Sequence, residues 1–354
     1  MHARNWVEIS RGALRQNLEY VRGRLGAGTE VCAVVKADAY GHGAVECARV
    51  FCGAGVRWLA VTSVAEGVRL RAGVPEARIL VLAGFFREEA EALVEHGLTP
   101  AVWDAEQIGW LGAAAGGGKF AIHLKLETGM GRLGVTSEQE AGVGAALAAA
   151  PGLEVEAVFS HLAASEGEEA GVLAQRQRLG EAAAGRAWHL LNSEGALRFP
   201  GWGGMLVRSG LALYGYSAQA EHAARLRPAL QWKTRVVAVK ELPAGHGVGY
   251  GAHFRTPRRM RVATLAAGYA DGYRRDFSPG ATVTIAGQAA PVVGAVSMDL
   301  TTVDVSHLPA VKLGEEAVLL GDGFGAGELA AVAGTIPYEV LCGISARVGR
   351  GYSN

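Results

Sequence analysis

The sequence is poor in cysteine and carries no net charge. Its four cysteines, Cys32, Cys47, Cys52 and Cys342, form no CxxC pair and show no zinc-type spacing. This argues against a disulfide-stapled scaffold or a zinc module and predicts reduced, buried thiols. The formal net charge is zero at pH 7, so the composition gives no indication of a nucleic-acid or anionic-membrane partner.

Targeting signals are also missing from the sequence. No apolar run reaches the about 20 residues that span a bilayer, and Met1–Trp6 lacks the apolar core of a signal peptide. With 354 residues, 50% of them hydrophobic, the chain is long enough for a large core and for two domains. We therefore expect a soluble, cytoplasmic, globular protein without a membrane partner.

Lysine is scarce as well, since arginine supplies most of the positive charge and the chain has only six lysines. Only Lys36 and Lys125 lie in or at the end of an apolar strand pattern. Lys36 follows the β-branched run Val31–Val35, after which Gly41 and Gly43 break the strand and lead into a helical segment.

An ammonium group at the end of an apolar strand is costly unless it is paired or neutralised. The same burial lowers the pKa of a lysine and makes its amine a usable nucleophile. Two interpretations of Lys36 stay open from this pattern. It forms a Schiff base with a carbonyl compound or pyridoxal phosphate, or its ammonium extends to water at the strand end.

From about residue 30 to residue 216, short apolar strands alternate with helical segments, which indicates a parallel α/β architecture. The expected strands are Val31–Val35, Trp58–Val61, Ile79–Leu82, Thr99–Val102, Phe120–Leu126, Val155–Phe159, His189–Leu191 and Met205–Val207. The expected helices are Ala44–Gly53, Ser63–Ala72, Arg87–Glu95, Ala105–Ala115, Gln139–Ala149 and Glu169–Ala184. About eight such units favour a (β/α)8 TIM-type barrel, with a doubly wound sheet as the alternative.

After about Pro228 the pattern changes to short alternating strands separated by Gly/Pro turns. The expected strands are Gln231–Glu241, Arg261–Ala267, Ala281–Ala286, Pro291–Met298, Thr301–Val305 and Ala317–Leu320. We therefore predict a barrel domain over residues 1–228 and a mostly-β domain over residues 229–354. Residues 1–10 are expected to contain a strand that could pair with the second domain.

Polar residues gather where the barrel strands end, which is where functional groups of such barrels lie. They are Lys36, Tyr40, Lys125, Arg132, His161, Asn192, Ser193, Arg208, Ser209 and Gly210. An amine, two arginines, an imidazole and a Ser-Gly loop on one rim suit an aromatic aldehyde phosphate, although each residue alone is more often structural. Tyr250 and Tyr269, between glycines in the second domain, are favoured as packing tyrosines by their local sequence alone.

The run Gly129–Gly134 matches the GxGxxG pattern of dinucleotide-binding loops. Such a site needs a helix that begins inside the glycine run, at the first βα unit of its domain. Here the run follows about the fifth strand, and Thr136–Glu138 is typical of a later helix cap. We therefore set the dinucleotide interpretation aside.

In this order and spacing, the motifs resemble those of bacterial alanine racemases over essentially the whole chain. The motifs are AVVKADAYGHG at residues 33–43, HLKLETGMGRLG at 123–134, VRSGLALYG at 207–215, Tyr250-Gly251, GYADG at 268–272, Met298-Asp299 and YEVLC at 338–342. The resemblance implies an isomerase that uses pyridoxal 5'-phosphate (PLP) to interconvert L-alanine and D-alanine and supplies D-alanine for peptidoglycan. It also implies a head-to-tail homodimer with active sites shared between subunits, and no metal.

The resemblance further implies roles for individual residues. Lys36 would carry PLP and act as the base on one face of the substrate, and Tyr250 of the partner subunit would be the base on the other face. The other cofactor contacts would come from Tyr40, Arg132, His161, Asn192, Ser193, Arg208, Tyr338 and the amides of Gly210 and Leu211. Substrate contacts would come from Arg132, Met298, Asp299 and Tyr269, with Arg275 in the access corridor, and Lys125 matches a lysine often found carbamylated.

The chemistry of racemisation explains these residue types. Removing the Cα proton on one face and returning one on the other needs two bases with pKa values near working pH. A free phenol titrates near 10, so Tyr250 needs nearby positive charge, for which the His161–Arg208 pair is the expected source. Arg208 opposite the ring nitrogen donates a hydrogen bond but no proton, which disfavours transamination.

The sequence departs from the family pattern at several positions. Ala295 stands where arginine is common, Ser297 where cysteine is usual, Leu300 where glutamine is usual, Gly249 where serine is common and Glu166 where aspartate is usual. These departures leave open a racemase of broader range, for example one acting on serine. A PLP-dependent decarboxylase is less favoured, because it would place a carboxylate against the ring nitrogen. A non-catalytic PLP carrier is disfavoured by the whole domain after Pro228.

Overall fold

The computed structural model describes residues 4–354, so residues 1–3 of the expected N-terminal strand segment lie outside the described part. The chain divides into two compact units. We call Ala13–Ala39 with Gly43–Arg227 the barrel unit, and the segment before Ala13 with Tyr40–His42 and Pro228–Asn354 the β unit.

The barrel unit contains eight parallel strands that neighbour one another in chain order, with the last strand beside the first. They are β2 (Glu30–Val34), β3 (Trp58–Val61), β4 (Arg78–Val81), β5 (Thr99–Val102), β6 (Phe120–Lys125), β7 (Leu153–Phe159), β8 (Trp188–His189) and β9 (Leu206–Ser209). The gap between β8 and β9 is bridged by the amides of Met205 and Arg208, which donate to the carbonyls of Trp188 and Leu191 at 2.8 and 3.0 Å. This order confirms the barrel and excludes the doubly wound sheet.

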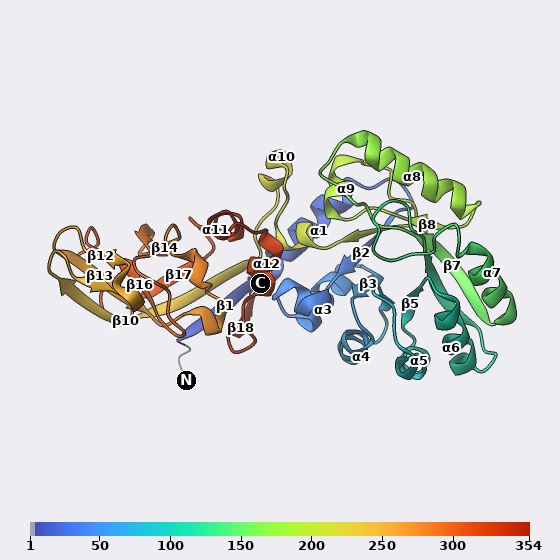
Figure 1. The fold of residues 1–354 in the computed structure, drawn as a ribbon, viewed down its shortest axis with the longest axis horizontal. Coiled ribbons are helices and arrows are strands. Elements are labelled where there is room, and N and C mark those ends of the chain that lie inside the picture. The colour runs from blue at the N-terminus through green and yellow to red at the C-terminus, as the bar shows by residue number, and fades with distance from the viewer. Residues whose placement is uncertain (1–3) are drawn as a thin grey trace. The chain divides into compact units, whose positions relative to one another are not determined.

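Helices connect the strands and lie along the outside of the sheet, as the blue-to-green part of Figure 1 shows for α3 to α8. The helices and helical turns are α1 (Arg11–Arg22), α2 (Lys36–Tyr40), α3 (Ala44–Gly53), α4 (Val64–Gly73), η1 (Arg87–Glu89), α5 (Ala90–Glu95), α6 (Ala105–Ala115), α7 (Glu140–Ala149), α8 (Glu169–Ala183), α9 (Ser193–Arg198), η2 (Leu211–Tyr214) and α10 (Ala220–Ala223). The local sequence determines where several of these helices begin. Ser63 and Glu66 form a reciprocal capping box at α4, and Asp104 accepts from the amide of Glu106 at α6.

The segment directly after β2 is a left-handed turn. Ala37, Asp38, Ala39 and Tyr40 all have φ between 50° and 55°, a conformation that costs a non-glycine residue roughly 1–2 kcal/mol. Side chains compensate for part of this cost. Glu66 accepts from the amide of Ala37, and Asp38 accepts from the amide of Ala44, both at 2.8 Å. Strain of this kind beside Lys36 is typical of a functional site.

The turn gives a test by glycine substitution. In a right-handed helix, Ala→Gly costs about 1 kcal/mol, and we expect that loss for Ala145→Gly in the exposed middle of α7. Ala37 is also exposed, but glycine there removes the left-handed penalty, so Ala37→Gly should leave stability unchanged or raise it by up to about 1 kcal/mol. Urea unfolding of both variants measures this, and equal losses would contradict the left-handed geometry.

The β unit is built on one eight-stranded sheet and one two-stranded ribbon. Its strands are β1 (Asn5–Ser10), β10 (Leu230–Leu242), β11 (Gly247–Val248), β12 (Phe254–Arg255), β13 (Met260–Leu265), β14 (Thr282–Ile285), β15 (Gln288–Pro291), β16 (Thr301–Asp304), β17 (Glu316–Leu320) and β18 (Gly349–Ser353). Its helical elements are η3 (Tyr250–Ala252), η4 (Tyr269–Asp271), η5 (Arg275–Phe277), α11 (Ala326–Ala333) and α12 (Pro337–Cys342). The long strand β10 pairs with β1, β13 and β17, and β1 also pairs in parallel with β18.

One expected strand of this unit was wrong, three of its elements were not predicted, and one expectation for the whole chain holds only in part. Pro291–Met298 is not a strand; β15 ends at Pro291, and the segment that follows is a loop. The two helices α11 and α12 and the strand β18 were not predicted, because short Gly-rich segments give little periodic signal. The thiol expectation also fails in part, because Cys32 and Cys47 are buried but Cys342 is exposed.

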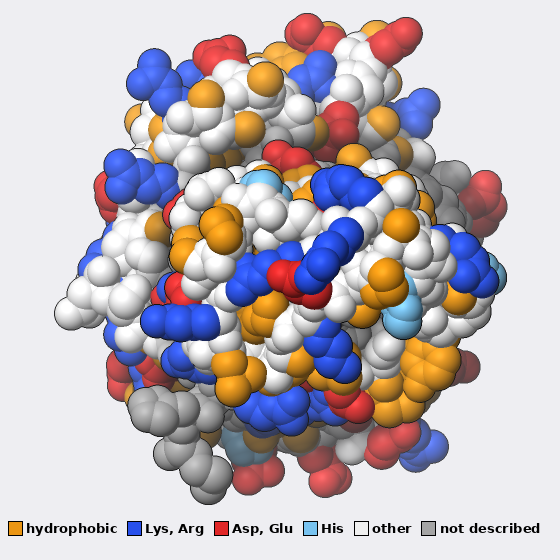
Figure 2. Space-filling view, turned by 90° about the vertical axis from the view of Figure 1, so that its left-hand side faces the viewer, with side chains coloured by type: hydrophobic (Ala, Val, Ile, Leu, Met, Phe, Trp, Pro, Cys, Tyr) orange, Lys and Arg blue, Asp and Glu red, His pale blue; other side chains and the backbone are white. Residues whose placement is uncertain are grey.

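The surface mixes charges of both signs. On the face drawn in Figure 2, Lys and Arg side chains alternate with acidic and apolar ones. Within residues 4–354, every helix falls short of the length and apolar character that a membrane span requires.

Candidate active site

The rim formed by the carboxyl ends of the barrel strands gathers the polar side chains expected there. Lys36 follows β2, Lys125 ends β6, His161 follows β7, and Arg208 lies in β9. Their charges affect one another, since burial and then the charges of Arg208, Lys125 and Lys36 lower the pKa of His161. The structure therefore brings one imidazole and several cationic side chains together at the end of the barrel where such folds hold their active sites.

Arg208 is the most connected residue of this rim. Its side chain is buried, and Nη2 donates to the carbonyls of Ser160 and Leu190 at 2.7 and 2.9 Å and lies 3.2 Å from Nδ1 of His161. Nη1 lies 2.5 Å from Nδ1 of His189. Burial lowers the pKa of Arg208 to about 10, so the guanidinium still carries its proton at neutral pH.

Burial also affects the bases around Arg208. Burial and the charge of Arg208 lower the pKa of His161 to about 3, so this imidazole is neutral. Burial and the charges of Arg208 and Arg132 lower the pKa of Lys125 to about 8. The ammonium of Lys125 lies 5.6 Å from the ring centroid of Phe159. An amine with this pKa is partly unprotonated near neutral pH.

Ser193 and the turn after β9 form a cluster of hydrogen-bond donors. The amides of Gly210 and Ala212 donate to Oγ of Ser193 at 2.9 and 3.2 Å, and Oγ of Ser209 lies 3.2 Å away. Both hydroxyls are buried. The amides of Gly210 and Ala212 are therefore engaged by Ser193, and the phosphate contact expected from the amides of Gly210 and Leu211 stays a prediction. A turn with closely spaced amides and buried hydroxyls is a place where an anion can bind.

Asn192 has a local role beside this cluster. Its Oδ1 accepts from the amide of Gly195 at 2.9 Å and caps α9, and its Nδ2 donates to Oγ of Ser165 at 3.1 Å. Both ends of the side-chain amide are therefore engaged within the protein.

The glycine run Gly129–Gly134 is organised around the carboxylate of Glu127. That carboxylate accepts from the amides of Gly129, Met130 and Gly131, the last two at 2.6 and 2.8 Å. No helix begins inside the run, because α7 starts at Glu140. The loop therefore uses its amides internally, and it places Arg132 in an exposed position after β6.

The residues expected to act from a partner subunit lie on the β unit. Tyr250, Tyr269 and Met298 have 69%, 43% and 54% of their surface exposed. The amides of Tyr269 and Ala270 donate to the carbonyls of Ser297 and Met298 at 3.0 and 2.9 Å. Two of the three side chains therefore extend from backbone segments that are bonded to each other.

A salt bridge fixes these two segments. Arg347 lies 2.6 Å from Asp271 in η4 and 2.7 Å from Asp299, the residue after Met298. Gly268 allows the close approach, because a Cβ there would lie 2.2 Å from the carbonyl oxygen of Ser297.

Tyr40 and Tyr338 also belong to the β unit, where their ring centroids lie 5.7 Å apart. Tyr40 is buried, and burial raises the pKa of its phenol, which therefore keeps its proton. The loop after Tyr40 is held by β18, because Arg350 donates to the carbonyl of Gly41 at 3.2 Å and Tyr352 donates to that of His42 at 3.0 Å.

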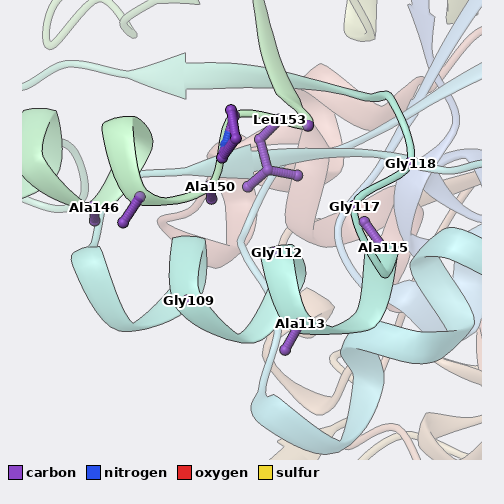
Figure 3. A pocket seen from close by; sticks show the side chains of 12 residues that line it. Gly109, Gly112, Ala113, Ala115, Gly117, Gly118, Ala146, Ala150 and Leu153 are labelled. Carbon is purple, nitrogen blue, oxygen red and sulfur yellow. The ribbon is translucent and has the colours of Figure 1, made fainter.

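A cavity of about 510 Å³ lies elsewhere in the barrel unit, against α6 and the loop before β7 (Figure 3). Its lining consists of glycines, alanines, Pro151 and Leu153, with no titratable side chain among them. This cavity therefore lacks the groups that acid–base or nucleophilic chemistry requires.

Three polar residues of the barrel interior were missed as functional candidates. His189 contacts Arg208, Nδ1 of His123 lies 2.8 Å from Nε2 of His189, and Glu156 lies beyond His123. The sequence did carry a signal, because His123 lies two residues before Lys125 on β6 and so faces the same side of the strand. A polar residue at such a position in an apolar strand needs a partner.

The histidine pKa gives a prediction on acid stability. His161 is neutral in the folded protein down to pH about 3, whereas in the unfolded chain it titrates near 6.5. The unfolded state takes up the proton first, so stability falls as pH drops from 6.5 towards 3, by up to about 1.4 kcal/mol per pH unit. Urea unfolding across this range should show a shallower fall for His161→Asn, and an unchanged slope would contradict the low pKa.

Comparison with known proteins gives a consistent result for both halves of the chain. Residues 9–218 match the family model of the alanine racemase N-terminal domain, and residues 229–352 match that of the C-terminal domain. The chain is 42% identical to an alanine racemase of Symbiobacterium thermophilum, over 98% of this chain and 96% of the relative. It is 38% identical to an alanine racemase of Sorangium cellulosum, over 98% of each.

The fold agrees with solved structures as well. The crystal structure of alanine racemase from D-cycloserine-producing Streptomyces lavendulae superposes with a TM-score of 0.94 at 34% identity, covering 100% of this chain and 98% of the other.

Proposed function

The chain belongs to the alanine racemase family, and we propose that it interconverts L-alanine and D-alanine with PLP as cofactor. The observation that carries the proposal is the buried, protonated Arg208 on a rim that also holds the amine of Lys36 and the hydrogen-bonded turn at Ser193. The product D-alanine would serve peptidoglycan synthesis, as the family implies.

The residues present fit PLP, which has an aldehyde, a phosphate and a ring nitrogen. Lys36 offers an amine for the aldehyde, and the hydroxyl of Ser193 with the amides of Gly210 and Leu211 would be the donors for the phosphate. Arg208 offers an N–H for the ring nitrogen. When bound, PLP supplies an electron sink that acidifies the Cα–H of an amino acid.

Arg208 decides what kind of PLP chemistry the site favours. Arginine donates hydrogen bonds only, and with a pKa of about 10 it keeps its proton at neutral pH. A carboxylic acid at this place would protonate the ring nitrogen, whereas Arg208 would donate a hydrogen bond to it and leave it unprotonated. This supports racemisation over transamination and argues against the decarboxylase alternative.

Two bases act on opposite faces in this proposal. Lys36 takes or returns the Cα proton on one face, and Tyr250 of a second copy does so on the other. Tyr250 is 69% exposed in the single chain, whereas a catalytic phenol works shielded from bulk water. A second copy that covers Tyr250 would provide this shielding, which supports the assignment. The protein would therefore act as a homodimer with shared sites.

The remaining residues have supporting roles in the proposal. Tyr40 and Tyr338 would contact the phosphate, Arg132 the phenolic oxygen of the cofactor, and His161 would lie beside the ring. Asn192 would act through its cap on α9. Met298, Asp299 and Tyr269 would bind or admit the substrate from the partner, and Lys125, with its pKa of about 8, would be open to carbamylation.

The first test is a chiral assay of the purified protein with PLP. L-alanine should be converted to the racemic mixture, and Lys36→Ala should reduce the rate about a thousandfold or more. L-serine in a parallel assay measures substrate range. A yellow protein that binds PLP through Lys36 without converting alanine would contradict the proposed reaction.

Subunit complementation tests the shared site. A heterodimer of a Lys36→Ala subunit and a Tyr250→Phe subunit contains one site with both substitutions and one with neither. Its activity should approach half that of the wild type, although each parent homodimer is nearly inactive. Lys240→Ala in place of Lys36→Ala serves as the control. Heterodimers no more active than the parents would exclude the shared site.

A further inference from the structure

A line of polar side chains runs from Arg208 into the barrel. Nη1 of Arg208 lies 2.5 Å from Nδ1 of His189, and Nε2 of His189 lies 2.8 Å from Nδ1 of His123. Nε2 of His123 is buried without a hydrogen-bond partner of ordinary geometry, and the polar atom it faces is Oε2 of Glu156, 3.5 Å away. Arg78 closes the line with two bonds to the carboxylate of Glu156, at 2.5 and 2.6 Å.

The direction of hydrogen bonding along this line follows from arginine chemistry. Arg208 only donates, so Nδ1 of His189 must be unprotonated and its proton must be on Nε2. That proton is donated to Nδ1 of His123, which places the proton of His123 on Nε2, facing Glu156. Arg78 also only donates. The residue between His123 and Arg78 must therefore accept on both sides, as a carboxylate does.

The strand geometry places Glu156 for this task. In the pairing of β6 with β7, Ile122 lies opposite Val155 but His123 lies opposite Ala157. Glu156 is the additional residue of a bulge in β7, a feature that redirects a side chain and recurs next to active sites. Here it turns a carboxylate towards His123 and Arg78.

Charge and burial agree with a fixed line. Burial alone would raise the pKa of Glu156, but its contacts with His123 and Arg78 outweigh this and lower the pKa to about 2. Burial and the charge of Arg208 lower the pKa of His189, which is thus neutral. Arg78 is held from its other side by the ring of Trp58, 4.0 Å from the centroid.

The buried guanidinium of Arg208 needs groups that hold it in position. Among residues 4–354, no carboxylate lies within ion-pair distance of its guanidinium, so the carbonyls of Ser160 and Leu190 and the imidazole of His189 stabilise its charge. A carboxylate in direct contact would occupy two N–H groups of the fork. The line occupies one and leaves others for a ligand at the rim.

We propose that Glu156 is a positioning residue for Arg208, because its carboxylate faces Nε2 of His123 and favours the same tautomers of His123 and His189 that let Nδ1 of His189 accept from the guanidinium. The benefit to catalysis rests on the proposed function, in which Arg208 faces the ring nitrogen of PLP. The tautomers themselves do not depend on that function.

Glu156→Gln gives a sharp test, because an amide accepts only at its oxygen. Arg78 takes that oxygen, and the NH2 group then faces Nε2 of His123. Nε2 must accept, so the proton of His123 moves to Nδ1, where it opposes the Nε2 proton of His189. Two N–H groups cannot hydrogen-bond to each other, so the proton of His189 is expected to move to Nδ1, where it faces the guanidinium of Arg208.

Nitrogen-15 NMR of the histidine rings measures the tautomers in the protein with and without PLP. The wild type should show His123 and His189 neutral and protonated at Nε2, and E156Q should show Nδ1 protonation at one or both. With alanine, E156Q should lower kcat about tenfold to a hundredfold, as expected for a misplaced reacting group. Its affinity for PLP should fall as well.

The matched control is Glu154→Gln, the same change on the same strand. Glu154 pairs with the exposed Lys119 at 2.9 Å, so E154Q should leave the tautomers, PLP affinity and kcat unchanged. Wild-type His189 protonated at Nδ1 would overturn the proposal without any variant. An E156Q protein that behaves like E154Q would overturn it too. A wild type with the expected tautomers but no alanine turnover would instead contradict the proposed function.

Discussion

The burial of one guanidinium without a carboxylate beside it is the constraint on which the site depends. Arg208 lies in β9 with its charge intact at a pKa of about 10, although burying an unpaired charge is costly. The barrel meets that cost with carbonyls that end β7 and β8, those of Ser160 and Leu190, and with imidazoles. The histidines are neutral because burial, and then the charge of Arg208, both lower their pKa values.

Much of the fold could be predicted from the sequence. The eight barrel strands are short apolar runs with helical segments between them, and the structure places them within about two residues of where the pattern put them, from Trp58–Val61 to Thr99–Val102. Prediction from hydrophobic periodicity failed in segments whose side chains show no regular alternation of apolar and polar residues. β15 was placed too late because the valines of 292–296 suggested a strand, and β18, rich in glycine, gave no signal.

The residues of the site also divide into those that the sequence could predict and those that it could not. Lys36 stands out in the sequence because it is a charged residue at the end of an apolar strand. Arg208 stands out for the same reason in the last barrel strand. The line through His189, His123 and Glu156 could not be predicted, since it depends on which strands are neighbours and on a one-residue bulge. Neither property is encoded in a local pattern. Nor could the sequence show that Tyr40–His42 groups with the distant segment around Tyr338.

The use of both lysine and arginine at this rim has a physical explanation. Both cation types are buried at the rim, but they respond differently: the pKa of Lys125 falls to about 8, whereas that of Arg208 falls only to about 10. A buried lysine can therefore lose its proton near neutral pH and act as a base or nucleophile, and a buried arginine cannot. An enzyme that moves protons at one atom and must not move them at another needs both. In the proposed mechanism, Lys36 would carry out proton transfer through its amine, and Arg208 would keep proton transfer away from the cofactor ring.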